Sequence, residues 1–315
     1  MELTVRPASH GVLVIKADGN EIVLQDGEEA HLRVSGREVE CRSGEYTLTA
    51  PAVRGEGRLN GPAEFILSVP GRISRQYRGG LEVEARGGRL LPVVTLDLEI
   101  AVASAVTAES PPHAPLEALK AQAVVTRSYY LAGARHAGFD FCDTTHCQFL
   151  REPPPADSPA ATATAATRGL VLTYQGEVIP ALFSASCGGR TRSLAEAGLT
   201  PRAYPYYPVI CEYCLRHAPR WQTTLNLENV HLLLSSPPTE ANRLSINRQL
   251  GWSTIPGNNY ALEEDGKRLI IRGNGQGHGI GLCQLGGSGL AAQGSTFQEI
   301  LNHYFPNSSL EGRDP

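Results

Sequence analysis

The sequence predicts an α+β protein, with an N-terminal β-rich accessory domain at residues 1–92 and a larger mixed α/β domain at residues 93–315. Two observations predict this division. Short runs of alternating apolar and polar residues, separated by Gly, Asp and Asn, fill the first part and are typical of antiparallel strands. From Leu96 the apolar residues recur at helical spacing instead. With 315 residues, 41% of them hydrophobic, the chain can bury one large core or two modest ones.

The N-terminal part carries strand signals and no motif that indicates chemistry. Gly87-Gly88 is the expected turn of a hairpin that leads into the second part. Cys41 is expected to be a small residue within a strand. The expected strands lie at residues 11–16, 21–25, 31–35 and 81–85.

Two helices are expected next. The first covers residues 96–109 and is ended by Pro111-Pro112, because the residue before a proline disfavours helical backbone. The second runs from Pro115 to about Ala137, with the proline in its first turn. One face of this helix is apolar, and its polar residues are Glu117, Lys120, Gln122 and Arg127.

The rest of the chain alternates between the two kinds of element. Residues 160–167 are rich in Ala and Thr and predict a surface helix. The runs at residues 170–174 and 178–183 predict strands on either side of a Gln175-Gly176 turn, and a final helix is expected at residues 296–304.

Charge and hydropathy exclude several classes of partner. The net charge is −4 and the pI about 6.2, without a run of Lys and Arg, which argues against nucleic acid and against anionic membranes. No apolar stretch reaches the roughly 18 residues that cross a bilayer. The first residues lack the basic and apolar segments of a signal peptide. The protein therefore either stays inside the cell or is exported by a signal that this sequence lacks.

The segment Asp140–Gln148 is the clearest chemical signal. It holds Cys142, His146 and Cys147, and His136 lies six residues before Cys142. Zinc binds such sulfur and nitrogen ligands tetrahedrally, and a loop can fold all four around one ion. A helix cannot, because adjacent side chains diverge by about 100°. The spacing fits no common zinc finger, so side chains that merely pack or point into solvent remain the alternative.

The other cysteines leave two interpretations open. Seven cysteines in a chain this long are too sparse for a disulfide scaffold. The pair Cys211-x-x-Cys214 is either half of a second zinc site or a disulfide partner of Cys187. A thioredoxin-like role would need a surrounding βαβ unit, and the sequence gives no sign of one.

A glycine-rich segment near the C-terminus, residues 273–281, predicts a tight turn. It is not followed by the Lys-Ser or Lys-Thr pair of a nucleotide-binding loop. The turn instead is expected to let His278 and Gln284 face a cleft. Packing alone gives little reason for a histidine enclosed by glycines.

Glu109 and Glu117 stand at opposite kinds of helix end. Glu109 ends the first expected helix, where the negative end of the helix dipole favours a protonated carboxyl. A protonated carboxyl is what glycosidic bond cleavage requires of a general acid, although an exposed Glu at a helix end is the simpler interpretation. Glu117 meets the positive end of the second helix, which suits a cap or an ion pair.

Three segments follow one another along the chain: Pro115–Tyr129, Ser184–Thr191 and Gly277–Gln284. They resemble the signature blocks of the stage II sporulation protein D and amidase-enhancer family of bacterial cell-wall proteins. The resemblance covers about residues 75–305 and includes the run that begins at Tyr77.

This resemblance implies binding of peptidoglycan glycan strands. In the sporulation branch of the family it implies a lytic transglycosylase, which cleaves between N-acetylmuramic acid and N-acetylglucosamine and leaves a 1,6-anhydro product. The essential glutamate of that branch corresponds best to Glu109, with Glu117 in reserve. The substrate-binding residues expected from the blocks are Lys120, Gln122, Arg127, Ser186, Gly188, Arg190, His278 and Gln284.

The resemblance also implies a cofactor, a location and a partner. Some members hold zinc with two His and two Cys in a similar loop, so a structural zinc is expected on His136, Cys142, His146 and Cys147. Because the substrate of the family lies outside the membrane, an extracytoplasmic location is expected. A cell-wall amidase is the expected protein partner.

The chain departs from the family pattern at three places. Ile100-Ala101 replaces an acidic-aromatic pair, Ser110 replaces a methionine, and Ser184 replaces a histidine in the cleft. The changes at Ser110 and Ser184 support the alternative of a protein that binds glycan strands and stimulates an amidase without cleaving sugars. A zinc hydrolase is disfavoured, because four protein ligands leave no open position for water.

Overall fold

The computed structural model describes residues 2–8, 11–144, 146–226 and 239–313, and it confirms the α+β class. The chain divides into two compact units. The first comprises Met1–Ala108 and Arg135–Ala161, and the second comprises Glu109–Ala134 and Thr162–Pro315. The predicted domain boundary between residues 92 and 93 stays a prediction, since compactness and independent folding are different properties.

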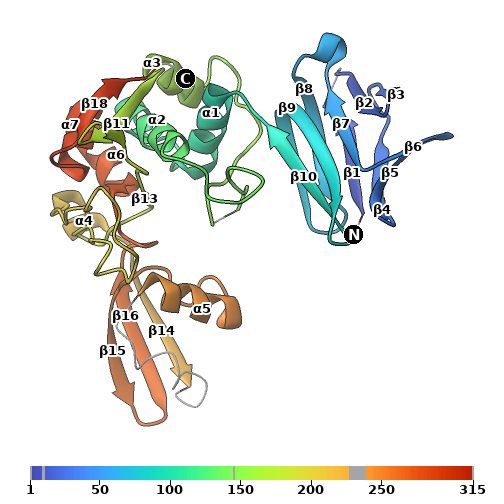
Figure 1. Ribbon diagram of the computed structural model, residues 1–315. Coiled ribbons are helices and arrows are strands. Elements are labelled where there is room, and N and C mark those ends of the chain that lie inside the picture. The colour runs from blue at the N-terminus through green and yellow to red at the C-terminus, as the bar shows by residue number, and fades with distance from the viewer. Residues whose placement is uncertain (1, 9–10, 145, 227–238, 314–315) are drawn as a thin grey trace. The chain divides into compact units, whose positions relative to one another are not determined.

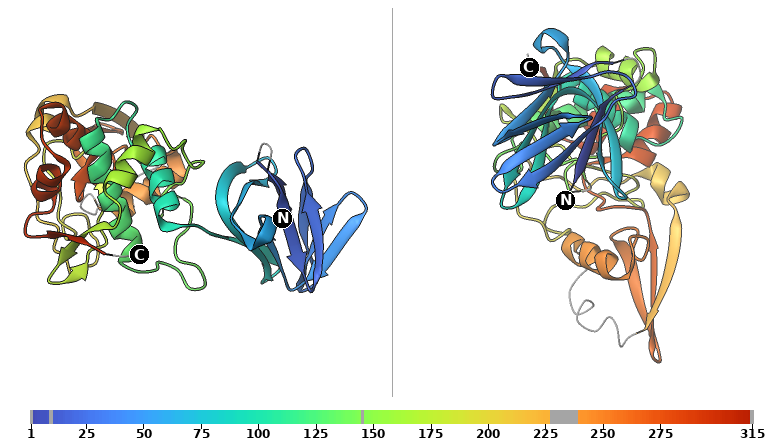
Figure 2. Two further views of the ribbon diagram at one scale, coloured as in Figure 1. Left: turned by 90° about the horizontal axis from the view of Figure 1, so that it is seen from above. Right: turned by 90° about the vertical axis from the view of Figure 1, so that its right-hand side faces the viewer.

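The first unit is built on one large antiparallel sheet. The strand order is β3-β2-β7-β9-β8-β1-β4-β5-β6, and β10 pairs with β9. The end strands β3 and β6 also contact each other, so the sheet curves into a near-barrel (Figures 1 and 2). Its strands are β1 (Leu3–Pro7), β2 (Leu13–Ala17), β3 (Asn20–Leu24), β4 (Ala30–Ser35), β5 (Glu38–Ser43), β6 (Tyr46–Ala50), β7 (Ala52–Glu56), β8 (Ala63–Val69), β9 (Ile73–Arg86) and β10 (Arg89–Thr95), with a short 3₁₀ helix at Arg58–Asn60.

The sequence explains this sheet well. The alternating runs form β2, β3, β4 and part of β9, and their inward side chains make the core of the unit. Gly87 and Gly88, with φ of 57° and 73°, form the expected hairpin turn between β9 and β10. Cys41 is fully buried in β5, and burial raises the pKa of its thiol to about 11. A buried thiol of this kind is inert.

Helix α1 (Leu98–Glu109) confirms the first expected helix. Asp97 caps its start, because one carboxylate oxygen accepts the backbone N–H groups of Glu99 at 3.0 Å and Ile100 at 3.2 Å. The helix ends before Pro111, as the paired prolines require. The division between the two units falls at its last residue.

The second unit surrounds helix α2 (Leu116–Leu131), which packs against α6 (Gln284–Ala292), α7 (Phe297–Tyr304) and strand β11 (Leu170–Tyr174). The helix is shorter than expected, ending at Leu131 instead of about Ala137. Its last backbone hydrogen bond joins Ala132 N–H to the carbonyl of Ser128, and Gly133 then turns the chain with φ of 122°.

The strand expected at residues 178–183 is wrong. Strand β12 (Glu177–Val178) pairs with β11, whereas β13 (Phe183–Ser184) pairs in parallel with β17 (Leu282–Cys283). Pro180 lies between them and has no backbone N–H to donate. Its carbonyl accepts a hydrogen bond from the Tyr206 hydroxyl. The two short strands therefore belong to different sheets.

The remaining elements confirm the other expected helices and add an unforeseen sheet. Helix α3 (Pro159–Ala166) lies in the Ala/Thr run, and α7 begins with a capping box between Thr296 and Glu299. A three-stranded sheet, in the order β14-β16-β15, has a small core of its own with α5 (Figure 1). The elements not yet given are α4 (Glu212–His217), β14 (Arg220–Asn226), α5 (Glu240–Leu250), β15 (Asn259–Asp265), β16 (Arg268–Asn274) and β18 (Ser309–Gly312).

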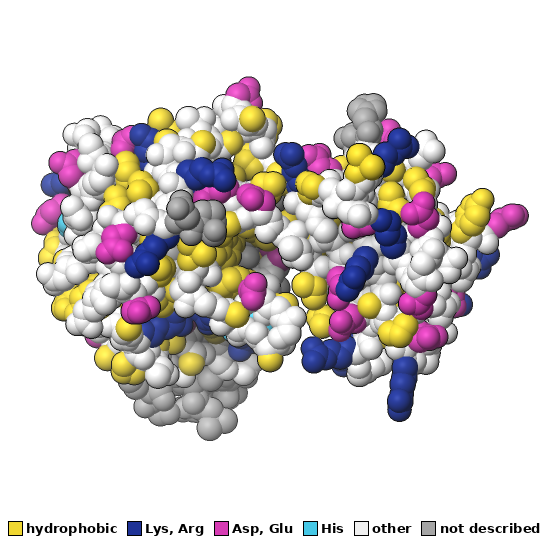
Figure 3. All heavy atoms as spheres, turned by 45° about the horizontal axis from the view of Figure 1, so that its top comes forward, with side chains coloured by type: hydrophobic (Ala, Val, Ile, Leu, Met, Phe, Trp, Pro, Cys, Tyr) yellow, Lys and Arg dark blue, Asp and Glu magenta, His cyan; other side chains and the backbone are white. Residues whose placement is uncertain are grey.

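The surface agrees with the charge pattern of the sequence. On the face drawn in Figure 3, acidic and basic side chains are interspersed without a patch of one sign. Within the described residues, no helix is both long and apolar enough to span a bilayer.

Candidate functional site

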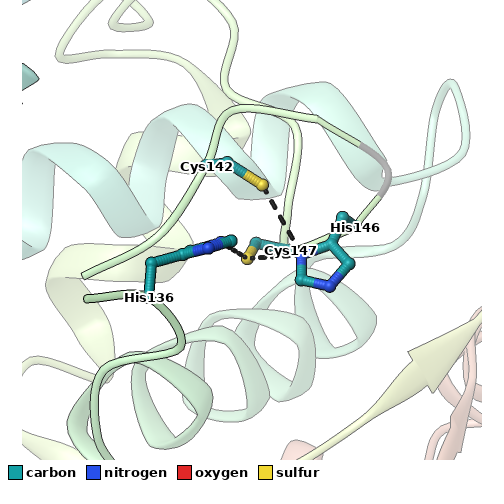
Figure 4. Close-up of side chains that lie close together, drawn as sticks. All are labelled: His136, Cys142, His146 and Cys147. Atoms are coloured by element: carbon teal, nitrogen blue, oxygen red, sulfur yellow. Dashed lines mark hydrogen bonds between the residues drawn. The ribbon is translucent and has the colours of Figure 1, made fainter. Parts of the chain in front are cut away.

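Four side chains of one loop converge in the first unit, and we call them the loop cluster: His136, Cys142, His146 and Cys147. Their ligand atoms all lie within 4.8 Å of one another (Figure 4). The Cys147 sulfur is 3.4 Å from His136 Nε2 and 3.5 Å from His146 Nδ1. The Cys142 sulfur is 3.7 Å from His146 Nδ1. A tetrahedral zinc with ordinary bond lengths separates sulfur and nitrogen ligands by about 3.6 Å.

Contacts within the same unit hold the loop in this shape. Asp143 accepts the Leu150 N–H at 2.8 Å with one oxygen and the Tyr77 hydroxyl at 2.9 Å with the other. The second oxygen also pairs with Arg75 at 2.9 Å. Thr144 accepts the His146 N–H at 3.2 Å and contacts the Cys142 sulfur at the same distance. Asp143 thus ties the loop to strand β9.

The donor set of the loop cluster fits zinc. Two imidazoles and two thiols are the soft-to-borderline ligands that zinc prefers, and they complete a tetrahedron without an open position. Burial raises the pKa of the Cys147 thiol, and a bound cation would reverse this effect because a metal-bound thiol is deprotonated. The arrangement suits a structural ion.

Glu109 lies beside residues of the other conspicuous segments. The Gln284 side-chain amide donates to the Glu109 backbone carbonyl at 2.8 Å and to the Gln122 side-chain oxygen at 3.3 Å. Gln122 in turn donates to Thr126 at 3.3 Å. These amides are almost fully buried. Residues 175 positions apart in the sequence therefore meet at the end of α1.

A small cavity of about 10 Å³, enough for about one water molecule, lies at this place, and we call it the pocket beside Glu109. None of the residues that line it has a carboxylate, although one of them, Ser110, directly follows Glu109 in the sequence. Among the described residues, the buried hydroxyls of Ser110 and Ser288 have no hydrogen-bond partner. Hydroxyls in this position can bind a ligand's polar groups. The pocket is lined by Ser110, Pro111, Ala114, Ala118, Leu119, Gln122, Leu282, Gln284, Gly287 and Ser288.

Glu117 is occupied by structural contacts. It pairs with Lys120 at 2.6 Å and accepts the Phe297 N–H at 2.8 Å, so it joins α2 to the start of α7. The hydrogen bond from Lys120, with a smaller contribution from Phe297, lowers the pKa of Glu117. The carboxyl is thereby held in its ionised form, the opposite of what a general acid needs.

The other expected substrate-binding residues separate into two groups. Ser186 and His278 lie in a tightly packed group with Asn258 and Asn274 that has no room for a water molecule, and burial lowers the pKa of His278. The Gly188 carbonyl accepts the Asn274 side-chain amide at 2.8 Å at the same place. None of these residues lines the pocket beside Glu109.

Two of the expected contacts have structural explanations instead. Arg127 is fully buried and donates to the backbone carbonyls of Leu170 at 3.1 Å and Thr164 at 3.4 Å. Its guanidinium is out of reach of a glycan strand in this conformation. Arg190 is exposed and pairs with Glu196 at 2.9 Å, so its role in substrate binding stays a prediction.

A second group of cysteines converges in the second unit, and we call it the buried cluster: Cys187, Cys211, Cys214 and Cys283. The sequence linked the first three but not Cys283. The signal that could have found it is a cysteine directly before Gln284, inside the last of the three conspicuous segments.

Comparisons with known proteins find similar sequences among bacterial sporulation proteins. A family model described as "Stage II sporulation protein" matches residues 86–174, which include α1, α2 and the loop cluster. Stage II sporulation protein D of Bacillus subtilis is 24% identical over 264 residues, 70% of this chain and 76% of that protein. In these comparisons the chain is similar in sequence to the stage II sporulation protein D family.

Two further relatives extend the comparison. An uncharacterised protein of Brachyspira hyodysenteriae is 29% identical over 263 residues, 73% of this chain and 71% of its own length. The amidase enhancer of Bacillus subtilis is 33% identical over 75 residues, 24% of this chain but 10% of that protein. Together these relationships support a cell-wall-related role.

Proposed function

We propose that this protein is a lytic transglycosylase of peptidoglycan, with Glu109 as its only general acid and base. The observation that carries the proposal is the hydrogen bond from Gln284 to the Glu109 backbone carbonyl at 2.8 Å. It fixes the end of α1 beside a pocket that also has the amide of Gln122 and two serine hydroxyls in its wall. A carboxyl at the C-terminal end of a helix is favoured in its protonated form, as the first step requires.

In the proposed reaction Glu109 donates its proton to the oxygen that bridges N-acetylmuramic acid and N-acetylglucosamine, and that bond breaks. The C6 hydroxyl of the muramic acid then attacks its own anomeric carbon and returns a proton to the Glu109 carboxylate. The products are a strand with a 1,6-anhydro end and a strand with a free hydroxyl. This route needs one acid and base, whereas hydrolysis by the common mechanisms uses a pair of carboxylates.

The proposal includes a structural zinc in the loop cluster. The ion would clamp the loop that follows α2 and supply folding energy, while the reaction itself would use Glu109. It also includes an extracytoplasmic place of action, because glycan strands lie outside the membrane.

The test is digestion of purified glycan strands by wild type, Glu109→Gln, Glu117→Gln and the control Glu99→Gln, which changes the other end of the same helix. We expect products with the anhydro mass, an at least thousandfold slower reaction of Glu109→Gln, and little change in Glu99→Gln. Loss of activity in Glu117→Gln alone would transfer the role to the reserve residue. Products that carry water instead of the anhydro ring would refute transglycosylation.

The second candidate is an enhancer that binds glycan strands and stimulates a cell-wall amidase. The match to the amidase enhancer favours it. A wide, shallow groove on the β14-β16-β15 sheet, which contains Trp221, Tyr260 and Arg272, offers a binding surface without residues of the pocket beside Glu109. Aromatic rings combined with planar polar groups suit sugars. Wild type that binds strands in a pull-down assay, releases no fragments and accelerates an added amidase would establish this alternative.

A further inference from the structure

The buried cluster lies in the core of the second unit and is assembled from three separate segments. Cys187 follows β13, Cys211 and Cys214 begin α4, and Cys283 ends β17. The four sulfurs lie within 4.8 Å of one another, and none of the four residues exposes more than 3% of its surface. The parallel pairing of β13 with β17 brings the first and the last of them together.

Hydrogen-bond donors surround part of the buried cluster. The Cys283 sulfur accepts the N–H groups of Cys187 at 3.2 Å and of Gly286 at 3.3 Å, and an N–H group can only donate. The Tyr304 hydroxyl lies 3.2 Å from the Cys211 sulfur. Ordinary buried thiols need no such set of donors, whereas metal-bound sulfurs regularly receive them.

The backbone around the cluster leaves no spare room. A Cβ atom on Gly286 would lie 2.4 Å from the Cys211 sulfur and 2.1 Å from the Tyr304 hydroxyl oxygen. On the next residue, Gly287, a Cβ would meet only ordinary contacts, at 3.4 Å or more. Glycine at position 286 therefore allows α6 to approach the sulfurs.

We propose that the buried cluster holds a second, resident zinc ion with four thiolate ligands. Tetrahedral zinc places its sulfurs about 3.8 Å apart, and the sulfurs of Cys214 and Cys283 are 3.4 Å apart. That separation is far from the roughly 2.05 Å of a disulfide. Four sulfurs packed this closely enclose room for one ion but not for a cluster of several iron and sulfide atoms. Four soft ligands select zinc and close its coordination shell.

The ion would hold in place the segments that carry Gln284, which lines the pocket beside Glu109, and Ser186. Cys283 is followed directly by Gln284, and Cys187 directly follows Ser186. Two of the three signature segments would thus be anchored to one metal together with α4. The proposal is independent of transglycosylase activity, because an enhancer of the same fold would need the same anchor.

The test is the zinc content and sulfur coordination of the purified chain, without added metal. Full occupancy of both clusters gives two zinc ions per chain and a mean of three sulfurs and one nitrogen per ion in X-ray absorption. Cys147→Ser should retain one zinc with four sulfurs, and Cys41→Ala, a buried cysteine outside both clusters, should retain both. Cys214→Ser should lose one zinc.

The wild type decides the outcome even if the variants do not fold. One zinc with four sulfurs supports the buried site and contradicts the loop site. One zinc with two sulfurs and two nitrogens overturns the proposal, as does stoichiometric iron. Loss of four mass units from the denatured, unreduced chain would reveal two disulfides and overturn it as well.

Discussion

The two cysteine clusters differ in how the chain assembles them. The loop cluster takes its ligands from residues 136–147, is partly exposed, and depends on one aspartate that ties it to a strand. The buried cluster takes its ligands from residues 187–283, is closed to solvent, and depends on a parallel strand pair. The contrast teaches that a metal site can be local and peripheral or can be part of the core, with different consequences for stability.

The largest expected effect is that of Cys283→Ser. Serine keeps an acceptor for the Gly286 N–H and so preserves the helix cap, but it removes one thiolate of the proposed ion. Because binding energy of a structural zinc is felt as folding energy, we expect the free energy of unfolding to fall by at least about 4 kcal/mol. Thermal unfolding with parallel zinc analysis measures this. A variant that loses zinc but unfolds at the wild-type temperature would contradict a core site.

The second largest effect is expected for a substitution that changes only the packing around the buried cluster. Gly286→Ala forces a methyl group against the Cys211 sulfur and Tyr304, whereas Gly287→Ala adds one in ordinary contact distance. We expect the first to cost about 3 kcal/mol and to release one zinc. The second should be neutral or slightly stabilising, since alanine favours helix over glycine by about 1 kcal/mol. Equal zinc contents and equal stabilities in the pair would refute the close fit.

The same contrast explains what the sequence could predict. Local patterns specified the loop cluster, the hairpin at Gly87-Gly88 and the capped helix α7, because each depends on residues close together in the chain. The contact of Gln284 with Glu109 bridges 175 positions, and only the fold creates it. Cys283 was missed for the same reason. Pro180 interrupted an apolar run that otherwise resembles a strand, and the run alone does not reveal which sheet each half joins.

A smaller effect is expected at the loop cluster. Cys147→Ser should lose the loop zinc and lower the free energy of unfolding by about 2 kcal/mol, because only a peripheral loop loosens while Asp143 still holds its base. Any loss of activity should follow that loosening. Differential scanning calorimetry with elemental analysis measures both quantities. Stoichiometric loop zinc in this variant would end the assignment of Cys147 as a ligand.

The smallest effect concerns acid. Low pH should weaken zinc binding by both clusters, and it should also weaken the ion pair of Glu117 with Lys120. The folded-state pKa of Glu117 is lowered, so its contribution is complete above the ordinary carboxyl pKa of about 4.3 and disappears as pH falls through the lowered value. Glu117→Gln should therefore cost about 0.5–1 kcal/mol at neutral pH, a modest figure because the side chain is about a third exposed.

The comparison of Glu117→Gln with wild type separates the contribution of the Glu117 carboxylate to acid sensitivity from that of zinc release. Both proteins should release zinc over the same pH range, since thiolate ligands compete with protons in each. The two stability curves should approach each other below the ordinary carboxyl pKa and converge below the lowered folded-state pKa of Glu117, because the wild-type carboxyl is then neutral as well. Urea unfolding at several pH values gives these curves. A difference in stability that stays constant down to the lowest pH would show that Lys120 and Phe297 do not depend on the charge of Glu117.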